Sequence, residues 1–141
     1  MRSPEKVKAE IVRQWIRKAE TDLEAAEVLF SKTPPLLYPA CFHSQQAAEK
    51  YLKAFLTWHQ VEFPKTHALG ELLDLISQVD EDLAVRLGGL TVLNPYGVEV
   101  RYPSDIPEPS RQQAEKALKL ASSAQKDIRD ALPLIVKPDL Q

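Results

Sequence analysis

The stretch "CFHSQQAAEKYLKAFL", residues 41–56, decides the fold. It contains neither glycine nor proline, and its apolar residues recur at helical spacing. At 100° per residue, the helix that it predicts has two halves. The apolar half holds Ala40, Cys41, Ala47, Tyr51, Leu52 and Phe55. The polar half holds Gln46, Glu49, Lys50, Lys53 and Thr57, with His43 near the boundary. We expect Gln45 and Lys53 to lie on a solvated face, where long lysine stems cover apolar neighbours.

Prolines divide the rest of the chain into windows. The 11 prolines leave four long proline-free stretches at 5–33, 40–63, 65–94 and 110–132. Proline breaks helix interiors and is tolerated in connections, so this spacing predicts helices joined by linkers. Apolar residues recur at helical spacing in these windows, and the first stripe is Ile11, Trp15, Ala19, Leu23, Ala26 and Phe30. The prediction is an all-α fold, an up-and-down antiparallel bundle of four to five helices.

The boundaries of this bundle follow from local signals. Residues 1–141 are expected to form a single helical domain with a core at about 10–132 and a C-terminal tail at 133–141. Gly88 and Gly89 should interrupt the helical pattern. Pro95 and Gly97 should loosen the following connection, and residues 98–102 should be an extended linker.

Composition bounds the functions that are open to this chain. The net charge of −2 argues against a strongly basic nucleic-acid binder, although it leaves room for a local basic patch. No run approaches the roughly 18 apolar residues of a membrane helix, and the N-terminus is too polar for a signal peptide. One cysteine, Cys41, excludes an internal disulfide and a cysteine-based metal cluster, and is expected to be a core residue. We expect a cytoplasmic protein without a metal or cofactor.

Asp22 is the polar residue that fits its helix least well. It falls inside the apolar stripe of the first window, where a carboxylate should be paired because isolated burial is costly. The candidate partners are His43, Lys50 and Arg101. Such a cluster at the edge of a core is either a structural pairing or part of a ligand site.

A second candidate site lies in "FPKTHALGELL", residues 63–73. Thr66 is predicted to cap a helix, with Lys65 and His67 on either side of it. The free N–H groups of a helix N-terminus attract anions, and Lys65 would strengthen that attraction for a phosphate. Capping of the helix alone would also explain a threonine at position 66, without a bound anion.

Several blocks of this sequence together resemble the HEPN-domain family, the small prokaryotic relatives of the domain at the end of sacsin. They are "AETDLEAAEVLF", "YPACFHSQQAAEKYLKAFL", "PKTHALGELL", "RYP" and "PSRQQAEKALKLASSAQKDI", and they cover roughly residues 10 to 132. The resemblance implies a helical bundle that is usually dimeric and that associates with nucleotides or nucleic acid. It also implies a minimal nucleotidyltransferase encoded nearby, often as a toxin–antitoxin pair.

Some members of the family are metal-independent ribonucleases that use an arginine followed, after four to six residues, by a histidine. This chain lacks that pattern, because none of its arginines has a histidine at +5, +6 or +7. The resemblance therefore implies a noncatalytic protein that binds a nucleotide or RNA phosphate and pairs with a nucleotidyltransferase. The expected phosphate ligands are Lys50, Lys65, His67 and Arg101, with His43 and Tyr102 near the base or ribose and Asp22 orienting a cation.

Two alternatives remain open at this point. One is a divergent ribonuclease that uses His43 or His67 with Arg101. The other is a dimerisation or adaptor module without a ligand, in which the polar strip of residues 43–53 is an interface. Phe42 falls on the polar side of its helix, so an outward aromatic group that anchors a homodimer is expected.

Overall fold

The computed structural model describes residues 3–97, 104–105 and 107–137. These residues form five α-helices and two 3₁₀-helices, and none of them lies in a β-strand. The elements are α1 (Pro4–Ser31), α2 (Leu37–Trp58), α3 (Leu69–Ser77), α4 (Glu81–Arg86), η1 (Gly88–Gly97), α5 (Arg111–Asp130) and η2 (Leu134–Val136). The predicted all-α bundle is confirmed. The linker predicted at 98–102 lies outside the described residues.

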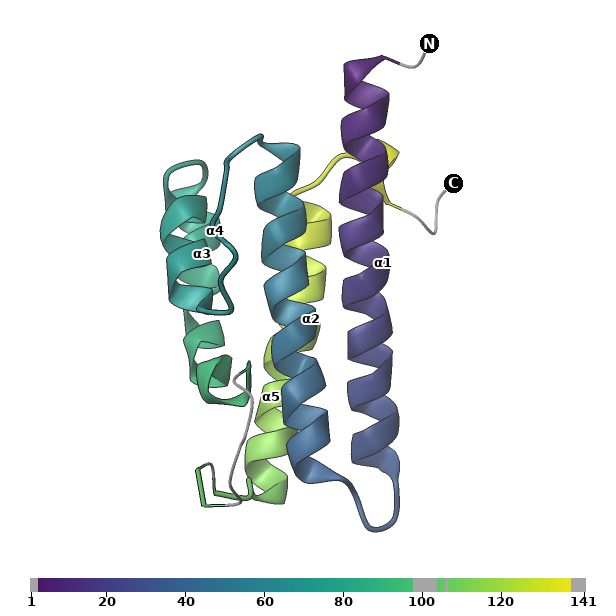
Figure 1. Ribbon diagram of the computed structural model, residues 1–141, viewed down its shortest axis with the longest axis vertical. Helices are drawn as coiled ribbons and strands as arrows, with labels where there is room; N and C mark the ends of the chain where they lie inside the picture. The colour runs from purple at the N-terminus through teal and green to yellow at the C-terminus, as the bar shows by residue number, and fades with distance from the viewer. Residues whose placement is uncertain (1–2, 98–103, 106, 138–141) are drawn as a thin grey trace.

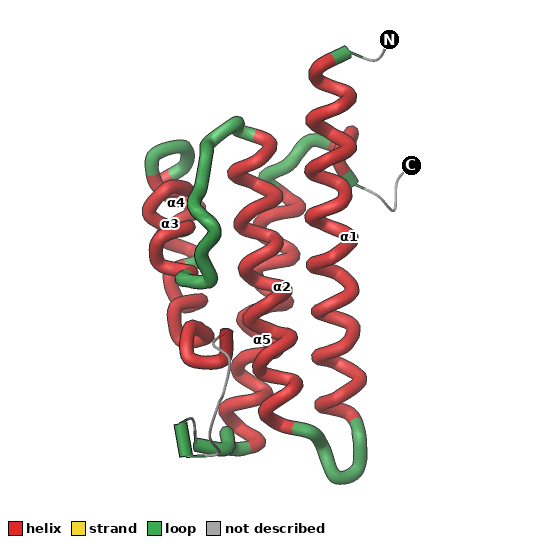
Figure 2. Tube along the Cα trace, viewed as in Figure 1, coloured by secondary structure: helices red, strands yellow, loops and turns green. Residues whose placement is uncertain are grey.

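The bundle is arranged around α2 (Figure 1). Helix α1 runs antiparallel to α2 on one side, and α5 lies behind both. The shorter helices α3 and α4, together with η1, form a layer on the other side of α2. Figure 2 shows that the connection 59–68 leaves the end of α2 and runs back beside this layer before α3 begins. Helix α2 therefore has neighbours on several sides.

Local capping explains where several helices begin. The Ser3 hydroxyl accepts a hydrogen bond from the Lys6 amide, and Pro4 follows at the first helical position, where its missing N–H costs nothing. Asp80 caps α4 through the Leu83 amide. Ser110 and Gln113 form a reciprocal capping box at the start of α5, which satisfies two backbone N–H groups. These caps fix helix ends that would otherwise fray.

Small residues allow the long helices to pack closely. The buried side of α5 consists of Ala114, Ala117, Ala121, Ala124 and Ile128. The periodicity predicts these five residues together with Leu118, which is half-buried. Larger side chains of α2, among them Tyr51 and Phe55, fill the space between the helices and are completely or almost completely buried. Alanine on one helix and aromatic residues on the facing one thus build the core.

The stripe predicted for α1 needs correction. The buried residues are Ala9, Val12, Ile16, Ala19, Leu23 and Ala26. Ile11 keeps 44% of its surface exposed and Trp15 is half-buried. The inward face is rotated toward Val12 and Ile16 because α1 must contact α2 and α5 together. Two large apolar groups are consequently left at the edge of the α1–α2 interface.

Two connections are more ordered than predicted. Gly88 and Gly89 are expected to interrupt a helix and Pro95 and Gly97 to loosen the connection that follows, but residues 88–97 form η1, with Leu90 and Leu93 buried. Proline and glycine are accepted there because the tighter 3₁₀ turn is short and irregular. The segment expected as a C-terminal tail packs on α1 as far as it is described. Val136 is fully buried, and the Arg13 guanidinium donates a hydrogen bond to the Ile135 carbonyl at 2.5 Å.

None of the helices in the described part of the chain combines the length and the apolar character that a bilayer-spanning segment needs.

Candidate functional site

A polar cluster lies where α1 and α2 face each other. His43 Nδ1 on α2 is 2.9 Å from Asp22 Oδ1 on α1, and the Lys50 ammonium contacts the other carboxylate oxygen. An ionised carboxylate only accepts hydrogen bonds, so His43 donates through Nδ1 and its Nε2 remains available. The side chain of Asp22 is 13% exposed, which makes both contacts important for its solvation. Two of the three expected partners of Asp22 are present, and Arg101 lies outside the described residues.

Further cations surround this cluster. An opening of about 300 Å³ is lined by Arg17, Lys18, Thr21, Asp22 and Lys50, and we call it the Asp22 opening. Within the described residues, neither Arg17 nor Lys18 forms an ion pair. Three cations therefore share one surface with a single carboxylate, and that carboxylate is already bonded to Lys50. The local charge is positive although the whole chain carries −2.

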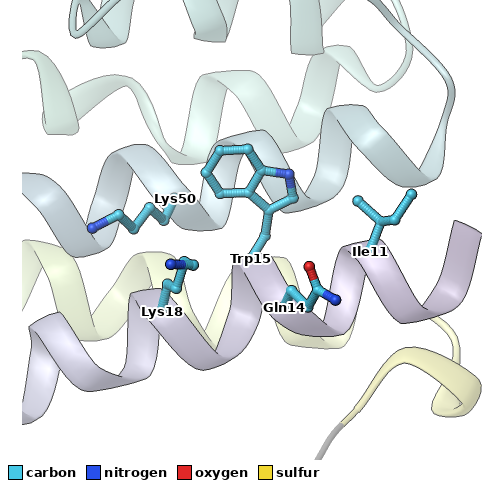
Figure 3. Close-up of a pocket in the computed structure, with 5 residues that line it drawn as sticks. All are labelled: Ile11, Gln14, Trp15, Lys18 and Lys50. Carbon is cyan, nitrogen blue, oxygen red and sulfur yellow. The ribbon is translucent and has the colours of Figure 1, made fainter.

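A second hollow adjoins the first along the same two helices. It has a volume of about 420 Å³ and is lined by Ile11, Gln14, Trp15, Lys18 and Lys50 (Figure 3), and we call it the Trp15 groove. Figure 3 shows the Trp15 indole extending from α1 across to α2, with Lys18 and Lys50 to one side of it. Both hollows are open to solvent, and they share these two lysines.

Glu49 is the centre of a buried polar network on another side of α2. Its side chain is only 4% exposed and pairs with the Lys53 ammonium at 3.0 Å. It also accepts hydrogen bonds from His67 Nδ1 at 2.8 Å and from Gln45 Nε2 at 3.4 Å. The prediction that Gln45 and Lys53 lie on a solvated face is wrong. The connection 59–68 and η1 cover this side of α2, so Glu49 and Lys53 are buried as a pair.

Gln45 also explains why residue 97 is a glycine. A Cβ atom built at Gly97 would lie 2.7 Å from the carboxamide of Gln45, closer than side chains tolerate. Gln45 cannot withdraw freely, because its amide group donates to the His67 carbonyl at 3.1 Å and its oxygen accepts from Gln46 at 2.7 Å. The close approach ties η1 to α2.

Replacing Gly97 with alanine is therefore expected to lower the free energy of unfolding by about 1–3 kcal/mol, the usual cost of overpacking. Gly88 is the matched control, since no atom lies within 4 Å of its added Cβ. Gly88→Ala should leave stability unchanged or raise it slightly, because alanine restricts the unfolded chain more than glycine does. Urea unfolding of both variants measures the difference. Equal midpoints for the two would contradict the close contact at Gly97.

The predicted site around Thr66 is arranged differently from the expectation. Helix α3 begins at Leu69, and its first amide donates to the Asn94 side chain on η1 at 2.9 Å. Thr66 instead closes a local turn by accepting a hydrogen bond from the Ala68 amide. His67 is directed to Glu49, and Lys65 is exposed on the connection. The Thr66 cap is thus wrong, because Asn94 on a distant segment takes its place.

The structure gathers some predicted site residues and not others. Asp22, His43 and Lys50 lie together between α1 and α2. His67 belongs to the Glu49 network, whereas Arg101 and Tyr102 lie outside the described residues. Sequence reasoning missed Arg17, Lys18 and Trp15. Lys18 and Asp22 are four residues apart on one helix, and this spacing was a signal that could have identified Lys18. In the described residues, no group of three His, Cys, Asp or Glu side chains could hold a metal ion.

Phe42 and Cys41 are neighbours on α2 and differ in burial. Phe42 is half-buried and contacts the His43 ring edge-on, with the ring centroids 5.2 Å apart. Cys41 is fully buried, as predicted. Burial raises the pKa of its thiol to about 11, partly offset by a hydrogen bond with Tyr96.

Comparison with known proteins identifies the family. The model of the HEPN domain family matches residues 12–129. The chain belongs to the HEPN family. A curated relative, "Putative toxin MJ1304" of Methanocaldococcus jannaschii, is 29% identical over 133 residues, which cover 84% of this chain and 86% of the relative.

Two solved structures share the fold of this HEPN protein. TT1696 from Thermus thermophilus is 28% identical, with a TM-score of 0.65 over 86% of this chain and 98% of its own. ST0689, an archaeal HEPN homologue, is 26% identical, with a TM-score of 0.65 over 85% of this chain and 96% of its own. The HEPN helical-bundle architecture is therefore shared along nearly the full length of both relatives.

Proposed function

We propose that this HEPN protein binds the phosphate of a nucleotide or RNA without catalysing a reaction, and that it acts in a toxin–antitoxin-like system with a nucleotidyltransferase partner. The observation that carries the binding proposal is the Asp22 opening, where Arg17, Lys18 and Lys50 surround about 300 Å³. Cations on the rim of an open hollow are suited to phosphate, which they bind by charge-assisted hydrogen bonds.

Asp22 has a positioning role in this proposal. Its contact with the Lys50 ammonium restrains a long side chain that would otherwise sample many rotamers. Its bond to His43 Nδ1 directs the opposite edge of the imidazole away from Asp22. A phosphate at the opening would meet Lys50 already in place and the cations of α1 beside it. Lys65 and His67 are not part of the Asp22 opening in this proposal. His67 is held by Glu49, and Lys65 lies on the connection 59–68.

The toxin–antitoxin part of the proposal is supported by the relative named as a toxin and by the family. It includes a homodimer and a nucleotidyltransferase as partner. Co-expression with the product of the neighbouring gene, followed by size-exclusion chromatography, tests the pairing. A dimerisation or adaptor module would form the complex with the nucleotidyltransferase but bind no ligand. Titration with nucleotides and RNA therefore separates such a module from a phosphate-binding protein.

Binding is tested by titrating ATP, GTP and a short labelled RNA against the wild type and the Lys18→Ala and Lys50→Ala variants. Each variant should weaken binding by about tenfold, the effect of losing one charge-assisted hydrogen bond. For RNA, the slope of log K against log salt should also decrease by about 1. Lys119→Ala is the control, because Lys119 is exposed on α5 and pairs only with Glu115 among the described residues. Absence of binding at millimolar ligand would refute the proposal.

A divergent ribonuclease is the second candidate, and one observation favours it. The Asp22–His43 hydrogen bond leaves His43 Nε2 free to take or give a proton, the arrangement of a histidine acting as general acid or base. Labelled RNA incubated with purified protein tests this candidate. Intact RNA would reject it, whereas cleavage that His43→Gln abolishes would replace the noncatalytic proposal.

A further inference from the structure

The Trp15 groove is more apolar than the opening beside it, and this difference is informative. Trp15 is half-buried and Ile11 is 44% exposed, so both present apolar surface to solvent between helices that are otherwise well packed. Gln14 is the one uncharged polar side chain in the lining, and Lys18 and Lys50 close the side nearest the Asp22 opening. The surface is thus aromatic on one side and cationic on the other.

Trp15 is held in place by its neighbours. Its ring meets Phe63 edge-on with the centroids 6.3 Å apart, and the buried Lys53 ammonium is 5.7 Å from its ring. Lys53 in turn is fixed by Glu49 at 3.0 Å. A restrained indole that is partly exposed in a groove loses little conformational entropy when a flat ring stacks on it. This is the physical requirement for an aromatic stacking platform.

The arrangement favours a strand over an enclosed small molecule. Pockets for small ligands bury most of the ligand surface, whereas both hollows here are open to solvent. Trp15 and Asp22 are seven residues apart on α1, a separation of about 10 Å along the helix axis. Lys18 and Lys50 lie in both hollows, so the aromatic and cationic surfaces form one continuous track.

We propose that the Trp15 groove and the Asp22 opening together bind single-stranded nucleic acid, with one base stacked on Trp15 and the adjoining phosphates on Lys18 and Lys50. This inference rests on the proposed phosphate-binding function and names its ligand as a single strand instead of a mononucleotide. Alternating aromatic and cationic groups bind single strands with little dependence on sequence, because every base has a face that can stack.

The chain has two tryptophans, so Trp58→Phe leaves Trp15 as the single tryptophan and makes its fluorescence a direct reporter of the groove. The probes are an eight-nucleotide adenine RNA, the DNA of the same sequence, AMP and pyrophosphate. We expect the RNA to quench Trp15 emission, pyrophosphate to compete with it without quenching, and AMP to bind at least tenfold more weakly. Equal affinity for RNA and DNA would mean that the track binds single strands with either sugar. Tighter binding of RNA would mean that its ligand is RNA.

Substitution of Trp15 separates this inference from the proposed function. Stacking contributes about 1–3 kcal/mol per base, so Trp15→Leu should weaken binding of the labelled RNA by about 5- to 100-fold. Trp15→Phe, which keeps an aromatic face, should recover part of the affinity, and urea unfolding shows that both variants are folded. If Trp15→Leu binds like the wild type while Lys18→Ala binds more weakly, the stacking inference is wrong and phosphate binding stands. If the wild type binds none of the probes, both proposals fail.

Discussion

Replacing Glu49 with leucine is expected to lower the free energy of unfolding by about 3–5 kcal/mol, because it leaves the Lys53 ammonium buried without its counter-charge. The Lys53 side chain is 9% exposed, so water cannot take over the role of the carboxylate. The substitution also removes the acceptor of His67 Nδ1 and the weaker of the two acceptors of Gln45 Nε2. Urea unfolding followed by far-UV circular dichroism measures the loss.

Two further variants make the result specific to burial. The double variant Glu49→Leu/Lys53→Leu removes both charges and should recover much of the lost stability, since a buried pair can be replaced by apolar residues at little cost. Glu115 and Lys119 form an exposed pair with the same spacing of four residues on α5. Glu115→Leu should change stability by less than about 0.5 kcal/mol. Equal effects at Glu49 and Glu115 would mean that the network contributes no more than a surface pair.

Cys41 is expected to react with thiol reagents at least 100-fold more slowly in the folded protein than in the unfolded chain. Burial raises the pKa of this thiol from 9.0 to about 11, which lowers the reactive thiolate fraction about 100-fold near pH 8. The side chain is also completely buried, which slows the reagent further. As Cys41 is the single cysteine, one modification monitored by mass spectrometry reports the rate.

The same shift gives the pH dependence a definite sign. The folded protein holds the proton more tightly than the unfolded chain, so the contribution of this thiol to stability is complete below pH 9. It is lost as the pH rises through about 11. If the thiol of the folded protein were modified as fast as that of the protein unfolded in urea, the expected protection of Cys41 would be absent. A free energy of unfolding that increases between pH 9 and 11 would contradict the sign of the pKa shift. Cys41→Ser provides the reference curve without the thiol.

The sequence predicts the helical bundle well because its signals are local. The proline-free windows and the apolar repeats at Leu69, Leu72, Leu73 and Ile76 depend on neighbours in the chain, and these four side chains are buried in α3. The repeat of small residues in α5 is equally direct. These local patterns do not predict how many other elements pack around each helix.

That number explains the errors on α2. A helical wheel divides a helix into one buried and one exposed half, but α2 contacts α1, α5, α3 and η1, so buried residues lie on several of its sides. Gln45 and Lys53 are therefore buried as polar groups with partners contributed by the helix itself and by the connection 59–68. The Asp22 cluster was predictable because a carboxylate inside an apolar stripe needs a partner. Trp15 was assigned to the core because an exposed edge cannot be recognised from periodicity alone.

The two hollows consist entirely of side chains from α1 and α2, which are joined by only the five residues 32–36. Closing so short a loop costs little chain entropy. The surface proposed to bind the ligand thus belongs to one helical hairpin. The layer of α3, α4 and η1 can change in length or sequence without altering it, provided that α2 keeps its buried neighbours.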